Sequence, residues 1–140
     1  MDSQKQVLEW IDKNRNAIIA FLQDLVRIPS VTGEEGPIQK FIAGRLKEMG
    51  FAVDVFEPDL AALRKHPAFV EVSRGYEGRP NVVGILKGKG GGKSLLFNGH
   101  VDVIPSGAPE SWQHGSWSGD LAGGRIYGRE QELTTVIRQW

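Results

Sequence analysis

The chain has 140 residues, 40% of them hydrophobic and 24% charged, a composition typical of a single globular domain with its own core. Its 17 Lys and Arg residues balance 17 Asp and Glu residues, which argues against a general attraction to nucleic acid or to an anionic membrane. There is no cysteine, so disulfides, thiolate zinc sites and cysteine nucleophiles are excluded, and a metal site would use His and carboxylates. The polar start is not followed by a continuous apolar stretch, which predicts neither a signal peptide nor a membrane span and favours a cytoplasmic protein.

Two amphipathic helices are predicted in the first 50 residues. The first ends near Arg27, before Pro29, and the second covers about residues 34–49. Thr32 and Glu35 have the spacing of a capping box at the start of the second helix, and Gly50 suits a left-handed C-cap. The apolar face of the first helix is Val7, Trp10, Ile11, Ile18, Phe21, Leu22, Leu25 and Val26, and that of the second is Ile38, Phe41, Ile42, Leu46 and Met49.

The following segments alternate between strand patterns and connections. Phe51, Val53 and Val55 alternate as in a strand that is buried on one face, and a short helix over 59–65 interrupts a connection. Residues 81–86 and 94–104 are predicted strands at the core of the sheet. The segment 87–93 between them contains four glycines and favours a hairpin turn, since it lacks the spacing of a phosphate-binding loop.

The predicted order of elements indicates an α/β fold with helices packed on a mixed sheet. Beyond Pro105 the chain is expected to be loop-like, with glycines between Trp112, Trp117 and Tyr127. Ligand sites in open α/β sheets lie beyond the carboxyl ends of strands, so the segment 98–105 is the first place to look for chemistry.

His100 and Asp102 are the candidate functional residues of that segment. Side chains alternate along a strand, so both would lie on one face, with Val101 and Val103 on the other. A metal-binding imidazole commonly donates its second ring proton to a carboxylate, which suits Asp102 as the orienting partner of a metal ligand. The alternative is a satisfied histidine beside a solvated aspartate, since this spacing arises often by chance.

A family resemblance favours the metal-site interpretation. It rests on the Gly99–Pro105 segment, on Trp112, on Trp117 with Ser118 and Gly119, on the Gly124–Arg129 segment, and on Leu25–Ser30 with Glu34 and Glu35. In these residues, from about Ala17 to Arg129, the chain resembles the M20 metallopeptidase and deacetylase family, and within it the acetylornithine deacetylase and succinyl-diaminopimelate desuccinylase branch.

The resemblance implies a three-layer α/β/α catalytic domain, interrupted by a smaller lid and dimerisation domain, that holds two neighbouring Zn²⁺ or Co²⁺ ions. It implies that His100 ligates one metal ion and that Asp102 orients it. The expected substrate is an N-acyl amino acid or a small peptide, cleaved at its amide bond by metal-activated water. A homodimer of the full-length parent is expected, with neither nucleic acid nor membrane as a partner.

The last residues depart from the family pattern. Leu133 stands where the resemblance implies an aspartate that bridges the two metals, and a hydrocarbon side chain cannot ligate a metal. Residues 1–129 are therefore expected to be the amino-terminal part of the catalytic domain, and residues 130–140 a divergent tail, with Glu130 and Glu132 out of register as replacement ligands. The expected result is a fragment that is inactive alone. The alternative is a non-catalytic folding or interaction fragment that associates through exposed sheet edges.

The remaining histidines, serines and tryptophans carry weaker signals for a functional site. His66 and His114 have no carboxylate at a useful spacing and are expected to be surface or loop histidines. Ser30 and Ser118 are not in a nucleophile-elbow sequence. Trp112 and Trp117 suit either the border of a substrate cleft or packing against a sheet edge.

Overall fold

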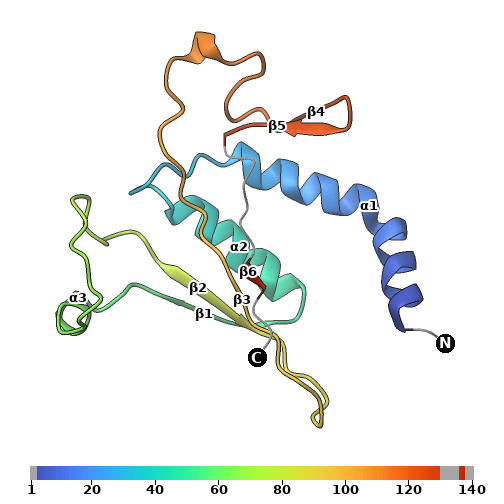
Figure 1. The fold of residues 1–140 in the computed structure, drawn as a ribbon, viewed down its shortest axis with the longest axis horizontal. Coiled ribbons are helices and arrows are strands. Elements are labelled where there is room, and N and C mark those ends of the chain that lie inside the picture. Colours follow the sequence, from blue (N-terminus) through green and yellow to red (C-terminus); the bar gives the residue numbers. More distant parts are fainter. Residues whose placement is uncertain (1–2, 130–135, 138–140) are drawn as a thin grey trace. The chain divides into compact units, whose positions relative to one another are not determined.

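The computed structural model describes residues 3–129 and 136–137 (Figure 1). The predicted tail, with Glu130, Glu132 and Leu133, therefore lies outside the described residues except for 136–137. The chain is mixed α/β, and its elements are α1 (Ser3–Arg27), α2 (Gly36–Glu48), β1 (Ala52–Phe56), α3 (Leu60–Leu63), β2 (Asn81–Ile85), β3 (Phe97–Asn98), the 3₁₀ helix η1 (Pro109–Ser111), β4 (Asp120–Ala122), β5 (Arg125–Tyr127) and β6 (Val136–Ile137).

The described residues form two compact units. One consists of residues 3–28 with 106–129, and the other of residues 29–105 with 136–137. No described helix combines the length and the apolar character that crossing a membrane requires.

In the first unit, α1 extends over the predicted range, but only its last turns pack. Phe21, Leu22, Leu25 and Val26 are half-buried, whereas Val7, Trp10, Ile11 and Ile18 are exposed. The packing partner is the segment after Ser116: Gln23 Nε2 donates to the Gly119 carbonyl at 2.6 Å, and Arg27 Nε donates to the Ser118 carbonyl at 3.2 Å. The predicted helix is thus confirmed. Of its predicted apolar face, only the residues in the carboxyl-terminal half are partly buried.

The expectation of a loop beyond Pro105 is wrong for residues 120–127. β4 and β5 pair in antiparallel fashion, with Asp120 opposite Tyr127 and Ala122 opposite Arg125. The two residues between the strands, Gly123 and Gly124, have φ of 56° and 76°, which two-residue hairpin turns with positive φ require. The same glycines that suggested a loop are therefore the turn of a hairpin.

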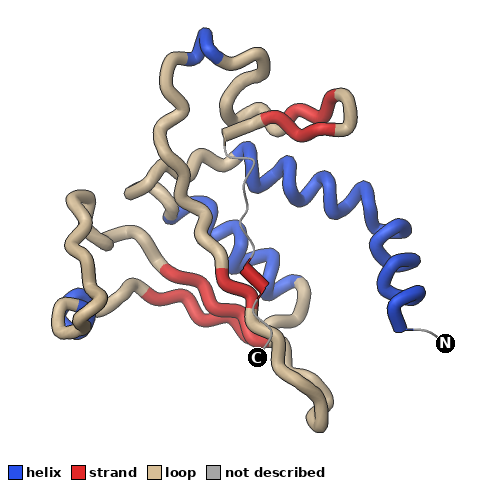
Figure 2. The backbone as a smooth tube through the Cα atoms, in the orientation of Figure 1, coloured by secondary structure: helices blue, strands red, loops and turns tan. Residues whose placement is uncertain are grey.

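In the second unit, α2 packs on the antiparallel pair β1–β2 (Figure 2). Ile38 and Ala43 of α2 are buried, with exposed fractions of 5% and 6%. Leu46 and Phe51 lie so close to Gly84 of β2 that a Cβ there would be 3.0 and 3.2 Å from them, so glycine lets the helix approach the strands. Met49, predicted in the buried stripe, is exposed, because the helix ends at Glu48 and Gly50 (φ 85°) turns the chain away.

The predicted capping box does not form. α2 begins at Gly36, and its N-cap residue Glu35 is helical with no side-chain cap hydrogen bond. Thr32 donates its hydroxyl to Asp102, and Glu35 binds the guanidinium of Arg79, so both side chains are engaged in longer-range contacts. The short helix predicted within residues 59–65 is confirmed as α3, where Asp59 accepts hydrogen bonds from the amides of Ala61 and Ala62.

The predicted pairing of strands 81–86 and 94–104 is wrong. β2 pairs with β1, and β3 pairs with β6, so the described strands form three two-stranded antiparallel sheets. The glycine-rich turn is present, with Gly90 and Gly91 at positive φ, but the residues on both sides of it are exposed rather than a sheet core. Only Phe97–Asn98 of the second run is a strand, and Val103 makes an isolated parallel bridge with Val31.

Candidate functional site

The segment that carries His100 and Asp102 is held by the chain just before α2. The Val103 amide donates to the Ser30 carbonyl and the Thr32 amide donates to the Val103 carbonyl, both at 3.0 Å. Ser30 Oγ donates to the Val101 carbonyl at 2.7 Å. Ser30 and Val103 are 2% and 7% exposed, so this parallel contact is a buried anchor for an otherwise irregular segment.

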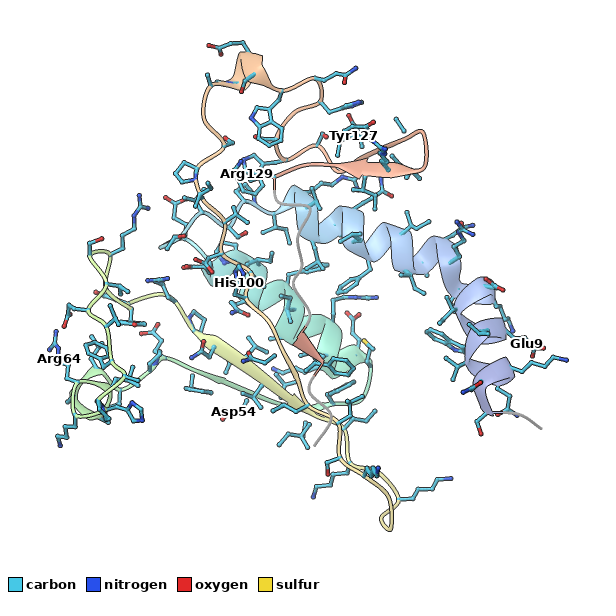
Figure 3. All side chains as sticks on the ribbon, viewed as in Figure 1. Glu9, Asp54, Arg64, His100, Tyr127 and Arg129 are labelled. Carbon is cyan, nitrogen blue, oxygen red and sulfur yellow. The ribbon has the colours of Figure 1, made fainter. Side chains whose placement is uncertain are left out.

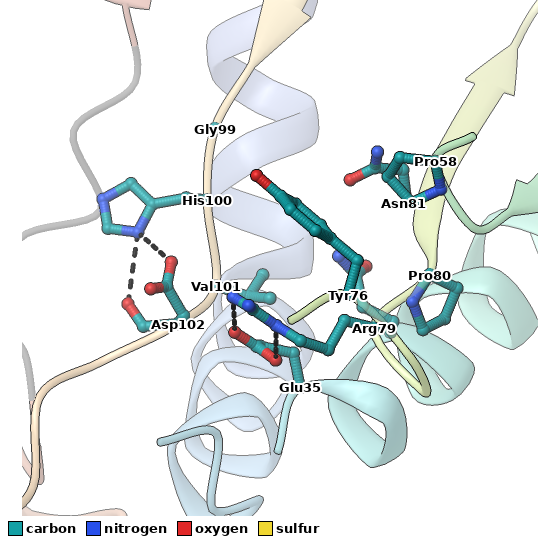
Figure 4. A pocket seen from close by; sticks show the side chains of 11 residues that line it. Glu35, Pro58, Tyr76, Arg79, Pro80, Asn81, Gly99, His100, Val101 and Asp102 are labelled. Carbon is teal, nitrogen blue, oxygen red and sulfur yellow. Dashed lines mark hydrogen bonds and ion pairs between the residues drawn. The ribbon is translucent and has the colours of Figure 1, made fainter. Parts of the chain in front are cut away.

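The structure brings His100 and Asp102 together. His100 Nδ1 lies 3.1 Å from Asp102 Oδ1 and 3.2 Å from the Asp102 carbonyl oxygen (Figure 4). The two side chains share one side, as the alternation predicted, although residues 100–102 are outside any strand. The imidazole projects from the segment between β3 and η1 and is 61% exposed, whereas Asp102 is 35% exposed (Figure 3).

This contact determines which ring nitrogen is open. Two oxygen acceptors face Nδ1, which favours the tautomer with the proton on Nδ1 and leaves the Nε2 lone pair for a ligand. Within the described part of the chain, no group of three His, Cys, Asp or Glu residues could hold a metal ion. The described residues therefore fit one imidazole ligand with its orienting carboxylate. The roles of His100 and Asp102 stay predictions.

A polar pocket of about 170 Å³ adjoins this pair. Its lining combines hydrogen-bonding and ionised side chains with backbone of the 99–102 segment, and all of it belongs to the second unit (Figure 4). The lining residues are Glu35, Gln39, Pro58, Tyr76, Arg79, Pro80, Asn81, Gly99, His100, Val101 and Asp102.

An ion pair between Glu35 and Arg79 forms the floor of this pocket. Arg79 Nη2 and Nε lie 2.7 and 2.8 Å from the two oxygens of Glu35, a bidentate geometry, and the side chains are 15% and 7% exposed. Burial on its own raises the pKa of Glu35, but hydrogen bonds from Arg79 and the Gly33 amide, with the charge of Arg79, lower it below 4.5 overall. Hydrogen bonding to Glu35 raises the pKa of Arg79, and the charge of Asp102 contributes to the rise.

Sequence reasoning missed Arg79. It lies in the segment assigned to a connection, next to Pro80, and nothing in the local pattern pairs it with a glutamate 44 positions earlier. The one sign of this ion pair in the sequence was Glu35 itself. It lies in a segment that carries the family resemblance, and its predicted role was only to cap a helix.

His66, Ser30, Ser118 and Trp112 are not among the residues that line this pocket. His66 is exposed, and its Nδ1 accepts from the Ala68 amide at 3.2 Å. Ser30 and Ser118 donate their hydroxyls to backbone carbonyls, which agrees with setting them aside as nucleophiles. Trp112 is half-buried and donates from Nε1 to the Ser106 carbonyl at 2.8 Å.

His114 lies in a loop as expected, but the expectation that it has no carboxylate partner is wrong. Its Nδ1 lies 3.1 Å from Asp120 Oδ2, and its ring stacks on Tyr127 with 3.9 Å between ring centroids and an interplanar angle of 25°. The partner was missed because the β4–β5 hairpin, which was not predicted, places Asp120 and Tyr127 opposite each other beside the histidine.

Comparison with known proteins identifies relatives of the chain. No protein-family model matches it. It is 39% identical over 112 residues to a protein named succinyl-diaminopimelate desuccinylase from Methylorubrum extorquens, with 79% of this chain and 25% of that protein covered. Proteins of the same name are 36% identical over 112 residues in a Methylobacterium species and 32% identical over 114 residues in Rhodopseudomonas palustris. Both matches cover 79% of this chain, and they cover 24% and 25% of the respective relatives.

These matches confirm the resemblance seen in the sequence. Over the matched 112 residues the chain is homologous to proteins of the M20 family of metallopeptidases and deacetylases. Its relatives within that family are the proteins named succinyl-diaminopimelate desuccinylase, and it spans about a quarter of their length.

Proposed function

We propose that the chain contributes the His–Asp part of a dinuclear metal site in a desuccinylase-like amidohydrolase. The observation that carries the proposal is the His100 imidazole, whose Nδ1 faces the Asp102 carboxylate while most of the ring is exposed beside a polar pocket. The substrate class is an N-acyl amino acid or small peptide. The name of the relatives makes succinyl-diaminopimelate the first compound to test.

The chain's residues have distinct roles in this proposal. His100 binds one metal ion through Nε2, and Asp102 holds the ring in the tautomer that leaves this nitrogen unprotonated. A bound Zn²⁺ or Co²⁺ ion supplies a Lewis acid that polarises the amide carbonyl and acidifies a water molecule. The ionised Glu35–Arg79 pair gives the neighbouring pocket a polar floor that suits the charged groups of an acylated amino acid.

The 140-residue chain alone is proposed to be inactive. Catalytic zinc usually takes about three protein ligands, and the described residues supply one imidazole. The same proposal includes the α/β/α sandwich, the division into a catalytic part (1–129) and a divergent tail (130–140), a homodimeric parent and a cytoplasmic location.

Two preparations test the function. The 140-residue chain should hydrolyse no succinyl-diaminopimelate with added Zn²⁺ or Co²⁺, and turnover with stoichiometric metal would contradict its inactivity. A chimera in which the 112 matched residues replace the corresponding segment of the M. extorquens relative should be active. His100→Ala in the chimera should abolish turnover, and the matched control His66→Ala should not. Full activity of the His100→Ala chimera would refute the metal-ligand role.

A second candidate, a non-catalytic interaction fragment, is supported by exposed apolar side chains in the second unit. Leu86, Leu95, Leu96 and Phe97 are 61%, 62%, 70% and 60% exposed, next to two-stranded sheets with open edges. This candidate predicts association that increases with concentration and does not depend on metal. Sedimentation velocity over a dilution series, with and without Zn²⁺, separates it from the first.

A further inference from the structure

We propose that Thr32 is a positioning residue for the His100–Asp102 pair, because its hydroxyl holds the carboxylate oxygen that the imidazole leaves open. The effect on metal binding rests on the proposed function, whereas the effect on the ring itself does not. The three side chains form a relay in which Thr32 Oγ1 donates to Asp102 Oδ2 at 2.9 Å and Asp102 Oδ1 lies 3.1 Å from His100 Nδ1.

Two hydrogen bonds fix the orientation of a carboxylate, whereas a single hydrogen bond does not. Rotation about the last bond of an aspartate is broad, so a single hydrogen bond leaves the plane of the carboxylate free to turn. Thr32 and His100 engage different oxygens of Asp102, so together they define that plane. A second acceptor for the Thr32 hydroxyl, the Val103 carbonyl, is more distant at 3.4 Å, so the proton is directed to Asp102.

Thr32 is itself held firmly enough to act as a reference point. Its amide donates to the Val103 carbonyl at 3.0 Å, and its carbonyl accepts from Arg74 Nη1 at 2.8 Å. The branched Cβ of threonine restricts the rotation that aims the hydroxyl. Gly33, at φ 103°, then turns the chain toward α2, and a Cβ there would lie 2.9 Å from the Arg74 side chain.

The consequence is a defined tautomer at His100. A carboxylate held facing Nδ1 keeps the proton on that nitrogen, so Nε2 of the exposed ring keeps a free lone pair. Without the hydroxyl, Asp102 turns more freely and its carboxylate supports the Nδ1 proton less, while the Asp102 carbonyl still faces that nitrogen at 3.2 Å. Thr32 thus acts through Asp102 and does not touch a substrate or a metal.

The experiment reads the His100 ring by ¹⁵N NMR in the metal-free 140-residue chain. The chain contains three histidines, so His66 and His114 serve as internal references in the same spectrum. All spectra are recorded at one alkaline pH, so that the native chain and the variants are compared under the same condition. The variants are Thr32→Val, which removes the hydroxyl at nearly constant shape, Thr32→Ser, which restores it, and Ser30→Ala, which removes a neighbouring hydroxyl bonded to backbone only.

In the native chain, His100 should be predominantly protonated on Nδ1. Thr32→Val should reduce that fraction, Thr32→Ser should restore it, and Ser30→Ala should leave it unchanged even if the fold is less stable. A native ring protonated on Nε2, or equal spectra of the native chain and Thr32→Val, would overturn the proposal. So would an equal change in Ser30→Ala, since it would indicate a general structural loss.

A Zn²⁺ titration of the same samples separates the two proposals. Zn²⁺ should perturb Nε2 of native His100, and Thr32→Val should weaken that binding by about threefold to tenfold, less than loss of a direct carboxylate partner. If the tautomer responds to Thr32 while the His100→Ala chimera keeps its full turnover, the positioning role stands and the metal-ligand role fails.

Discussion

The two histidine–aspartate pairs of this chain have the same contact distance in different surroundings. In both His100–Asp102 and His114–Asp120, the Nδ1-to-carboxylate distance is 3.1 Å. The His100 ring is 61% exposed beside a polar pocket, whereas the His114 side chain is 25% exposed and stacks on Tyr127. The His–Asp contact alone therefore does not distinguish the two histidines. The features that distinguish His100 are its exposed ring and a carboxylate partner, Asp102, whose other oxygen accepts a hydrogen bond from Thr32.

The largest expected effect concerns the ion pair below the His100 pocket. Arg79→Met removes the partner of a Glu35 side chain that is 7% exposed, so the free energy of unfolding of the second unit should fall by about 3 kcal/mol. Urea unfolding and hydrogen exchange at the Val103 amide measure it. The matched control is Arg64→Met, which breaks an exposed pair with Glu71 and should change stability little. Equal losses in the two variants would show that burial of the Glu35–Arg79 pair is unimportant.

The next effect separates the two histidine pairs directly. Asp102→Asn should weaken Zn²⁺ binding at His100 by about 10- to 100-fold, because an amide no longer enforces the Nδ1-protonated ring. Asp120→Asn, the same change in the other pair, should leave binding at His100 unaltered. An NMR titration of the imidazole nitrogens measures both. Comparable losses in the two variants would remove the distinction between the pairs.

A smaller effect is the pH dependence that Glu35 gives to the second unit. The pKa of folded Glu35 lies below its ordinary 4.5, so its ionised form stabilises the fold above that value. This contribution should be lost as the pH falls through the lower, folded pKa. Urea unfolding measured between neutral pH and strongly acidic pH should show the loss. In Arg79→Met the dependence should be weaker, and an unchanged profile would contradict the assignment.

The smallest effect concerns the stacked pair of the first unit. Tyr127→Leu removes the ring that His114 packs on, which should destabilise the β4–β5 hairpin by about 1 kcal/mol. Faster hydrogen exchange at the amides of β4 and β5 is the measurement. Zn²⁺ binding at His100 should not change, and a change there would mean that the two pairs are coupled.

The sequence predicted the elements whose signals are local. The apolar period of α1 and α2, the Gly50 cap and the short helix α3 each depend on residues within a few positions, and all are present. It also placed His100 and Asp102 side by side, because two residues separated by one position share a side in extended chain.

The features that were missed depend on contacts between distant residues. Thr32 and Glu35 match a capping box by spacing, but Thr32 donates to Asp102, and Glu35 binds Arg79 and the Gly33 amide instead of the capping-box partners. β2 pairs with β1 rather than across the glycine turn, since pairing is decided by what α2 covers and not by the turn alone. A pattern of single residues carries no information on such choices.

The bridge between Val31 and Val103 determines when the segment that carries His100 becomes ordered during folding. Ser30 and Val101, which are joined by a hydrogen bond, are 71 positions apart, so a long loop must close before the 100–102 segment is held. Closing such a loop costs entropy that local contacts do not repay, so its formation is expected late. An isolated peptide of residues 94–105 would thus present a freely rotating imidazole. Ordering of His100 would report that the second unit has completed its assembly.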